Sequence, residues 1–292
     1  AFTRASPSCA PPPPRSPLPG RLDNEMMYAL RDARTLSAVL ARYARTEAFR
    51  VWASFALSAA VLFWLFSSGE FSFILTLSSL VSTFSFLMVV MQIEGGGGAA
   101  GVSLRMAECY VAVFAGRLCA IVPFEGYLPF DRSGDWLYQT SEACALCLAG
   151  WVVHCCRARH ARTYSAAADT MNHLWFMVPA LAAALIFHPS LNDHTPSDIA
   201  WAFALYLESV AVLCQFHMFM KEGKAQAHTA HFLAAQALAK MMSFVFWAAS
   251  VRQLSDSRHA YAKVLVGPCV VVMQIIQLLV MVDFIFNYVE CI

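Results

Sequence analysis

The chain has 292 residues, of which 59% are hydrophobic and only 13% are charged, and its mean hydropathy is +0.56. Soluble domains have about twice this share of charged residues, so the composition indicates a membrane protein. The net charge of +1 gives no reason to expect a nucleic-acid partner. The nine histidines show no metal-ligand spacing and no nucleophile stands beside a suitable base, so we expect no metal, no cofactor and no enzymatic activity.

The first 47 residues differ from the rest of the chain. Residues 1–22 are rich in Pro, Ser and Arg, a composition that predicts disorder. The same stretch is basic and poor in acidic residues, as transit peptides are. Residues 23–47 are expected to form an amphipathic helix with a basic face. We therefore predict a basic extension over residues 1–47 that does not span the membrane.

Eight apolar segments follow this extension, and each is long enough, at about 17–25 residues, to cross a bilayer as a helix. Helices are expected because every backbone polar group in lipid must be bonded within the protein. The predicted spans are 48–67, 71–93, 107–124, 136–156, 172–188, 199–220, 229–250 and 262–288.

The distribution of Lys and Arg predicts the orientation of these spans. Fourteen of the twenty lie on the side of the membrane that holds the N-terminus, four lie on the other side, and Arg117 and Lys240 lie inside spans. Cytoplasmic loops have the excess of basic residues, so we predict a cytosolic N-terminus. Eight of the fourteen precede residue 51, so most of this signal comes from the N-terminal extension.

Charged side chains inside the spans are the first candidates for function. Arg117, Glu208 and Lys240 lie at depth, and Asp283 lies in the last span. A charge at mid-bilayer costs at least about 2.5–3.5 kcal/mol on insertion scales, so such groups face a cavity or each other. We predict that Glu208 is held by a cationic partner, Lys240 or Arg117. Two interpretations remain open: a salt bridge between helices without a ligand, or a water-filled cavity with a positive floor that captures an anionic group.

Five stretches resemble one known family, in the family's order and at compatible spacing. The most specific is "YLESVAVLCQF" (206–216), which is similar to the L-E-S-V-A-x-L-P-Q signature of the KDEL receptors, the ER lumen protein-retaining receptors. The resemblance covers residues 70–290. The other four stretches are "GVSLRMAECYVAVFAGRL" (101–118), "DTMNHLWFMVP" (169–179), "PSDIAWAF" (196–203) and "IIQLLVMVDFIF" (275–286).

The resemblance implies an all-α polytopic membrane protein. The family fold has seven helices, with two three-helix bundles of inverted topology, as in PQ-loop and SWEET transporters. Residues 70–292 would form this seven-helix domain. Residues 48–67 would form one additional transmembrane helix in front of it, which returns the basic N-terminus to the cytosol.

The resemblance also implies a function and a location. The family binds the C-terminal Lys-Asp-Glu-Leu tail of escaped ER residents in the acidic Golgi and returns them to the ER in COPI vesicles. The expected partners are therefore a KDEL-like peptide, the COPI coat machinery and membrane lipids, and the expected location is the membranes of the ER and Golgi. The sequence ends at Ile292 without the lysine-rich tail that the family uses to recruit the coat.

Several residues match functional positions of the family. The resemblance implies that Arg117 receives the terminal carboxylate of the peptide. Asp283 matches an aspartate linked to retrograde transport. The other implied ligand-binding residues are Asp198, Trp201, Glu208, Lys240 and Trp247.

Other positions depart from the family pattern. Lys240 stands where the family has an arginine, and a lysine lacks the planar fork that binds a carboxylate through two hydrogen bonds. Five further departures are Leu75 for an arginine, Ser82 for a histidine, Ala239 for a tyrosine, Ser250 for an arginine and Cys214 for the signature proline.

Three functions therefore stay open. The first is a diverged retrieval receptor. The second is a protein of the same fold that no longer retrieves and acts as an accessory subunit of a membrane complex, in a plastid or mitochondrion if residues 1–22 are a transit peptide. The third is a small-solute transporter built on the inverted-repeat fold.

Overall fold

The computed structural model describes residues 73–122, 136–188, 194–222, 227–255 and 266–289, together with six single positions between residues 53 and 64. The chain divides into two units, residues 1–60 and 61–292, and the following concerns the second unit. The predicted N-terminal extension and nearly all of the predicted extra helix at 48–67 lie outside the described residues.

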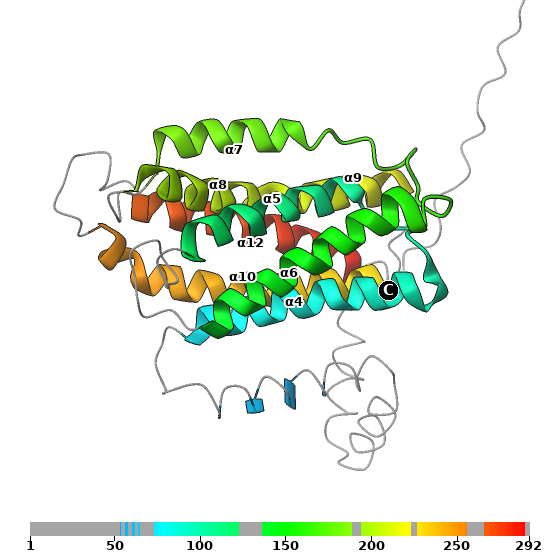
Figure 1. The fold of residues 1–292 in the computed structure, drawn as a ribbon, viewed down its shortest axis with the longest axis horizontal. Coiled ribbons are helices and arrows are strands. Elements are labelled where there is room, and N and C mark those ends of the chain that lie inside the picture. The colour runs from blue at the N-terminus through cyan, green and yellow to red at the C-terminus, as the bar shows by residue number, and fades with distance from the viewer. Residues whose placement is uncertain are drawn as a thin grey trace, which may run out of the picture. The chain divides into compact units, whose positions relative to one another are not determined.

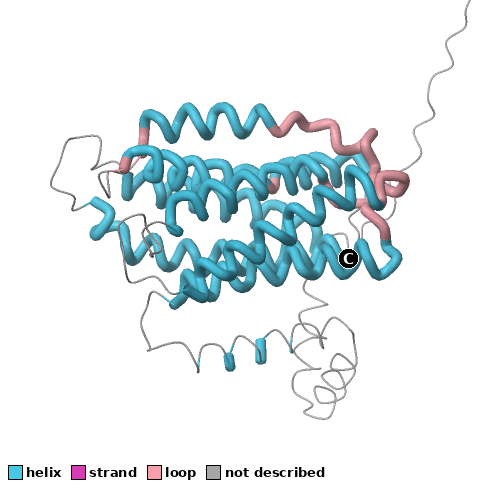
Figure 2. Tube along the Cα trace, in the orientation of Figure 1, coloured by secondary structure: helices cyan, strands magenta, loops and turns pink. Residues whose placement is uncertain are grey.

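The described part of the second unit consists of helices and the loops between them (Figures 1 and 2). Two of the helices end in a short π-helical turn, η1 (Ile93–Gly97) after α4 and η3 (Cys155–Arg159) after α6. The helices are α4 (Phe73–Gln92), α5 (Leu104–Ile121), α6 (Trp136–His154), α7 (Leu174–Ile186), α8 (Thr195–Ala211), α9 (Leu213–Glu222), α10 (Ala227–Ser255) and α12 (Val266–Val289).

These helices confirm the predicted all-helical membrane architecture. Among the described residues, Phe73–Gly96, Thr195–Glu222 and His231–Ser250 are long and apolar enough to cross a membrane, and Leu174–Ile186 and Gly267–Val282 are shorter apolar helices. The two remaining helices, α5 and α6, have 18 and 19 residues. At 1.5 Å per residue they extend over nearly the whole hydrocarbon core, which is about 30 Å thick.

The predicted span 199–220 is interrupted. α8 ends at Ala211, and the amide of Gln215 bonds to the carbonyl of Val212 rather than to one four residues back. The break lies two residues before Cys214, which stands where the family signature has a proline. The interruption therefore exists in this chain although no proline forces it.

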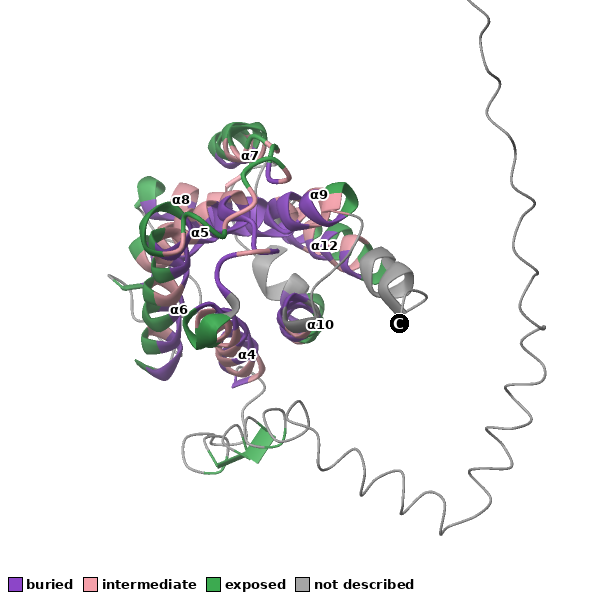
Figure 3. Cartoon of the chain, turned by 90° about the vertical axis from the view of Figure 1, so that its right-hand side faces the viewer, coloured by how far each residue is buried: buried purple, intermediate pink, exposed green. Residues whose placement is uncertain are grey.

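The helices form two groups of three with matching contacts. α6 packs against both α4 and α5, and α12 packs against both α8 and α10. The groups meet where α4 packs on α10 and where α5 packs on α8. The two groups correspond helix by helix: α4 to α8, α5 to α10 and α6 to α12. Under this correspondence every contact named above has a counterpart that is also present, as expected of an inverted repeat. α7 packs on the outside of α8 and buries only Ala180 and Ala184 (Figure 3).

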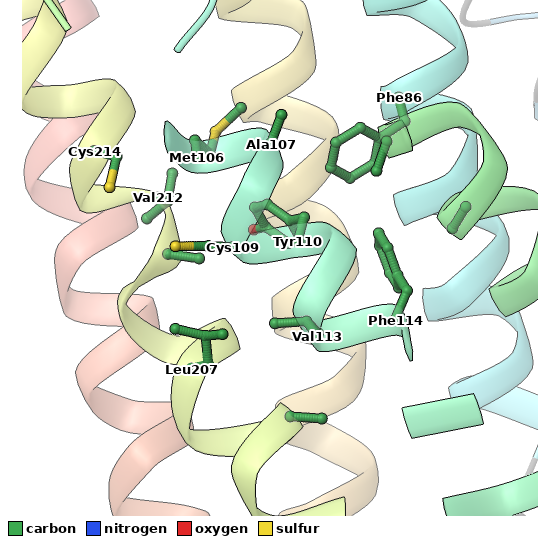
Figure 4. Packing of buried hydrophobic residues seen from close by; sticks show 14 of the residues in the cluster. Phe86, Met106, Ala107, Cys109, Tyr110, Val113, Phe114, Leu207, Val212 and Cys214 are labelled. Carbon is green, nitrogen blue, oxygen red and sulfur yellow. The ribbon is translucent and has the colours of Figure 1, made fainter. Parts of the chain in front are cut away.

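Aromatic side chains fill the seam between the two groups. The ring of Phe86 on α4 meets Tyr110, Phe114 and Phe232 edge to face, with ring centroids 5.1, 5.6 and 5.3 Å apart. Such edge-to-face contacts contribute about 0.5–1.5 kcal/mol each beyond the burial of their area. Tyr110 and Phe114 lie on α5, which crosses the centre of the core (Figure 4).

Three of the resembling stretches meet at the N-terminus of α5. The Ser103 side chain caps the helix by accepting the Met106 amide, and its hydroxyl donates to the Asp169 carboxylate at 2.9 Å. Gln215 donates to the Gly101 carbonyl and accepts the Ser103 amide, at 2.9 and 2.8 Å. Polar groups that cap α5 therefore come from two other parts of the chain, which satisfies the free amides of its first turn.

Tyr164 completes this capping cluster. Its hydroxyl donates to Asp169 at 2.8 Å. Burial raises the pKa of Tyr164, and the hydrogen bond to the Asp169 carboxylate raises the pKa further, so the hydroxyl stays protonated as a donor.

Candidate functional site

Two helices of the second group direct the predicted side chains toward one cavity. On α8, Trp201 and Glu208 are seven residues apart, which is about two helical turns, and so they share a face. On α10, Lys240 and Trp247 have the same separation and share a face in the same way. The indole rings of Trp201 and Trp247 meet edge to face, with centroids 5.5 Å apart.

Glu208 has cationic partners, as predicted, and it has two of them. Arg117 on α5 donates from Nη2 to one carboxylate oxygen at 2.6 Å, and Lys240 donates from Nζ to the other. The side chains of Arg117, Glu208 and Lys240 are 14%, 5% and 4% exposed. Both oxygens of a buried carboxylate are thus compensated, which makes the charge tolerable inside the bundle.

A fourth charged residue, Glu142 on α6, joins the cluster and was not among the predicted site residues. Nη1 of Arg117 lies 3.1 and 3.0 Å from its two carboxylate oxygens, and the Ser79 hydroxyl donates to one of them at 2.8 Å. The Glu142 side chain is 1% exposed. A signal was present, because Glu142 is the only charged residue between Asp135 and Arg157.

Glu142 corrects the predicted electrostatics of the site. The cluster contains two cations, Arg117 and Lys240, and two anions, Glu142 and Glu208, so its formal charge is zero. The predicted positive floor is therefore wrong for the state that the structure describes. A neutral set of four paired charges is what a low-dielectric interior tolerates best.

The ion cluster forms one wall of a small, partly open cavity between the two helix groups. Its volume is about 30 Å³, which is room for about two water molecules. Leu75 and Ser82, two of the positions predicted to depart from the family pattern, both line it. The full lining is Leu75, Ser78, Ser79, Ser82, Arg117, Tyr138, Glu142, Trp201, Leu205, Glu208, Lys240, Ser243 and Trp247.

Five of the six predicted ligand-binding residues therefore line one cavity: Arg117, Trp201, Glu208, Lys240 and Trp247. The sixth, Asp198, is fully buried in the first turn of α8, and it is not among the residues that line the cavity. Asp283 belongs to α12, and its side chain lies outside the described residues.

One further cluster has the donor atoms of a metal site. Ligand atoms of Glu94, Cys155 and His160 lie within 4.8 Å of one another at the end of the bundle. The Glu94 carboxylate already accepts the indole N–H of Trp151 at 3.0 Å and pairs with the Arg159 guanidinium at 3.0 Å. A cation would have to displace Arg159, so we interpret the cluster as an ion pair that joins η1 to η3.

The fold and the cavity define a polytopic helical membrane protein with an ionisable site between two three-helix groups. A model of the ER lumen protein retaining receptor family matches residues 98–250, which is more than half of the chain. The chain therefore belongs to the ER lumen protein-retaining receptor family, and the resemblance found in the sequence is confirmed.

Curated relatives agree with this assignment at low identity. The chain is 26% identical over 204 residues to ER lumen protein-retaining receptor erd-2.2 of Caenorhabditis elegans. The aligned region covers 70% of this chain and 86% of that protein. It is 28% identical over 162 residues to receptor 2 of Homo sapiens, covering 55% of this chain and 71% of the relative. It is 25% identical over 172 residues to receptor 3 of Mus musculus, covering 59% and 75%.

Proposed function

We propose that the chain is a receptor that binds C-terminal retention signals of the Lys-Asp-Glu-Leu type in the Golgi and returns their carriers to the ER. The observation that supports this most is the position of Arg117. Its guanidinium lies in the cavity between the helix groups and already pairs there with a carboxylate, that of Glu142. The proposal assigns no catalytic step to the chain.

Arg117 is proposed to bind the terminal carboxylate of the peptide. A planar group with several N–H donors matches a carboxylate, and a hydrogen bond to a charged group contributes about 1.5–3 kcal/mol. Lys240 and Glu208 would hold Arg117 in place and adjust the charge of the cavity. Trp201 and Trp247 would form an aromatic wall against the apolar part of the peptide, and Asp198 would contribute from the first turn of α8.

Peptide binding requires the cavity to open. A volume of about 30 Å³ holds water but not four amino acids. The contacts of α4 with α10 and of α5 with α8 join the two groups. A relative movement of the groups is therefore part of the proposal, since it would widen the cavity without unfolding any helix.

A peptide titration tests the receptor function. The full chain in lipid nanodiscs would be titrated with a fluorescent Lys-Asp-Glu-Leu peptide at about pH 5.5 and about pH 7.4. We expect tighter binding in acid, because the proposed cycle requires capture in the acidic Golgi and release in the ER. Absence of binding at both pH values would contradict the proposal.

The control for Arg117 must keep the cluster neutral. Arg117→Ala alone leaves two buried carboxylates with one cation between them, so it would confound binding with folding. The double variant Arg117→Gln with Glu142→Gln removes one charge of each sign and keeps the Lys240–Glu208 pair. We expect this double variant to fold and to lose peptide binding at both pH values.

The proposed location and partners have a separate test. We propose the membranes of the ER and Golgi as the location, and the COPI coat machinery as the partner on the cytosolic side, with Asp283 in the place of the aspartate that the family links to retrograde transport. Fluorescence microscopy of the tagged full-length chain should show ER and Golgi signal. Plastid or mitochondrial signal would contradict retrieval.

One observation favours the second candidate function, an accessory protein of the same fold that no longer retrieves. The four charges of the cluster are mutually paired and neutral without a ligand, as they are in a structural ion network. Loss of the first-helix cation and histidine to Leu75 and Ser82 agrees with such a role. The peptide titration separates the two functions.

A further inference from the structure

We infer that Glu142 is a built-in carboxylate ligand of Arg117 that occupies the place of the peptide's terminal carboxylate and competes with the peptide. The inference rests on the proposed function, because it assigns a competitor to the site at which the peptide would bind. It adds a residue that the family resemblance did not single out and gives that residue a definite effect on affinity.

The geometry of Glu142 is that of a bound ligand. Both of its oxygens lie within 3.1 Å of one guanidinium nitrogen of Arg117, and the Ser79 hydroxyl from α4 donates to the oxygen Oε1 at 2.8 Å. The Ser79 hydroxyl can at the same time accept a hydrogen bond from the Ser141 hydroxyl, 3.0 Å away. The carboxylate thus has an ionic partner from α5 and a hydroxyl partner from α4, which orient it toward Arg117.

Competition follows from the charge and the space around Arg117. In the structure, Nη1 of Arg117 is directed at Glu142 and Nη2 is directed at Glu208. Both terminal nitrogens are therefore engaged by the protein's own carboxylates, and the remaining volume is about 30 Å³. A third carboxylate in this neutral and nearly filled site would leave an uncompensated negative charge, so an incoming carboxylate must replace one of the two. Glu208 has two cationic partners, Arg117 and Lys240, whereas among the described residues Glu142 pairs with Arg117 alone. Glu142 is therefore the more weakly held carboxylate and the one that the peptide displaces.

The test compares Glu142→Gln with the wild-type chain. Glutamine keeps the size of the side chain but loses the charge, so Arg117 becomes available while Glu208 still holds it. The same substitution at Glu108 is the matched control, because Glu108 pairs with Arg105 and Arg157 outside the cavity. Ser79→Ala is the second variant: it removes a hydrogen bond to Glu142 without changing any charge.

Each full chain in nanodiscs is titrated with three peptides: Lys-Asp-Glu-Leu with a free carboxylate, its C-terminal amide, and tetra-alanine with a free carboxylate.

We expect Glu142→Gln to bind free Lys-Asp-Glu-Leu at least about tenfold more tightly than the wild-type chain, since it removes a charged competitor. Ser79→Ala should give a smaller gain, Glu108→Gln should match the wild-type chain, and the amidated peptide should gain nothing. Unchanged or weaker binding by Glu142→Gln, with measurable binding by the wild-type chain, would overturn the inference and leave the receptor function standing.

Two further outcomes separate the inference from the proposed function. If Glu142→Gln improves binding of tetra-alanine as much as that of Lys-Asp-Glu-Leu, Glu142 does block a carboxylate site, but the site does not recognise a retention signal, and the receptor function fails. If neither the wild-type chain nor Glu142→Gln binds any peptide, both proposals are overturned.

Discussion

Arg117 compensates two buried carboxylates, so its charge affects stability as well as binding. Its guanidinium pairs with Glu142 at 3.0 Å and with Glu208 at 2.6 Å, and Glu208 has Lys240 as a second partner. Removing one member of a buried ion pair leaves an uncompensated charge, which costs about 3–5 kcal/mol. Removing a cation and an anion together avoids this cost.

This argument predicts an order of stability among charge variants. Arg117→Gln should lower the free energy of unfolding by about 3–5 kcal/mol, because Glu142 loses its cation. Lys240→Gln should lower it less, because Glu208 keeps Arg117. The double variant Arg117→Gln with Glu142→Gln should recover most of the loss. Thermal unfolding of the purified chains in one detergent measures the order, and a double variant no more stable than Arg117→Gln would contradict the charge-balance argument.

At the scale of elements, the N-terminus of α5 depends on segments far away in the sequence. Asp169 accepts hydrogen bonds from the Ser103 hydroxyl, the Arg105 amide and the Tyr164 hydroxyl, at 2.9, 3.2 and 2.8 Å. Three of the stretches that resemble the family thus each contribute a residue to one capping cluster. Because α5 also holds Arg117, the cap helps to position the ion cluster.

Asp169→Ala should therefore destabilise the chain. A buried donor that loses its partner costs about 1–3 kcal/mol, and three donors lose theirs here. Thr170→Ala is the control, since Thr170 is exposed and surface substitutions change stability by about 0.5 kcal/mol or less. Thermal unfolding compares the two variants with the wild-type chain. Equal melting temperatures for Asp169→Ala and Thr170→Ala would rule out a capping role.

Hydropathy predicted the helices well because lipid burial leaves a long apolar pattern, but it placed some ends wrongly. The span predicted at 107–124 is α5 at Leu104–Ile121, since the first turn contains Arg105, which an apolar window excludes. The interruption near Val212 was missed because no proline or glycine marks it. The isolated charge of Glu142 in its span was a sequence signal, but its pairing with Arg117 depends on how α6 packs against α5 and so needs the folded structure.

At the scale of the whole molecule, the structure groups the loops that the charge count assigned to one side. The Ala99 amide bonds to the Thr163 hydroxyl at 2.9 Å, and the Lys221 ammonium bonds to the Thr170 hydroxyl. The loops that follow α4, α6 and α9 therefore lie together at one end of the bundle. Successive spans place successive loops on alternate sides of the membrane, and the shared end of these loops agrees with that alternation. The assignment of this end to the cytosol rests on its basic residues.

Glycosylation-site scanning tests both parts of this topology. An Asn-x-Ser/Thr acceptor is modified only on the luminal side, so acceptors placed in 221–228 should stay unmodified and acceptors in 190–197 should be modified. The reverse pattern would overturn the orientation but not the fold. A third acceptor in 157–171 gives the internal control, because the contact between Lys221 and Thr170 requires it to behave as the one in 221–228 does. Different results at 157–171 and 221–228 would contradict the helix arrangement itself.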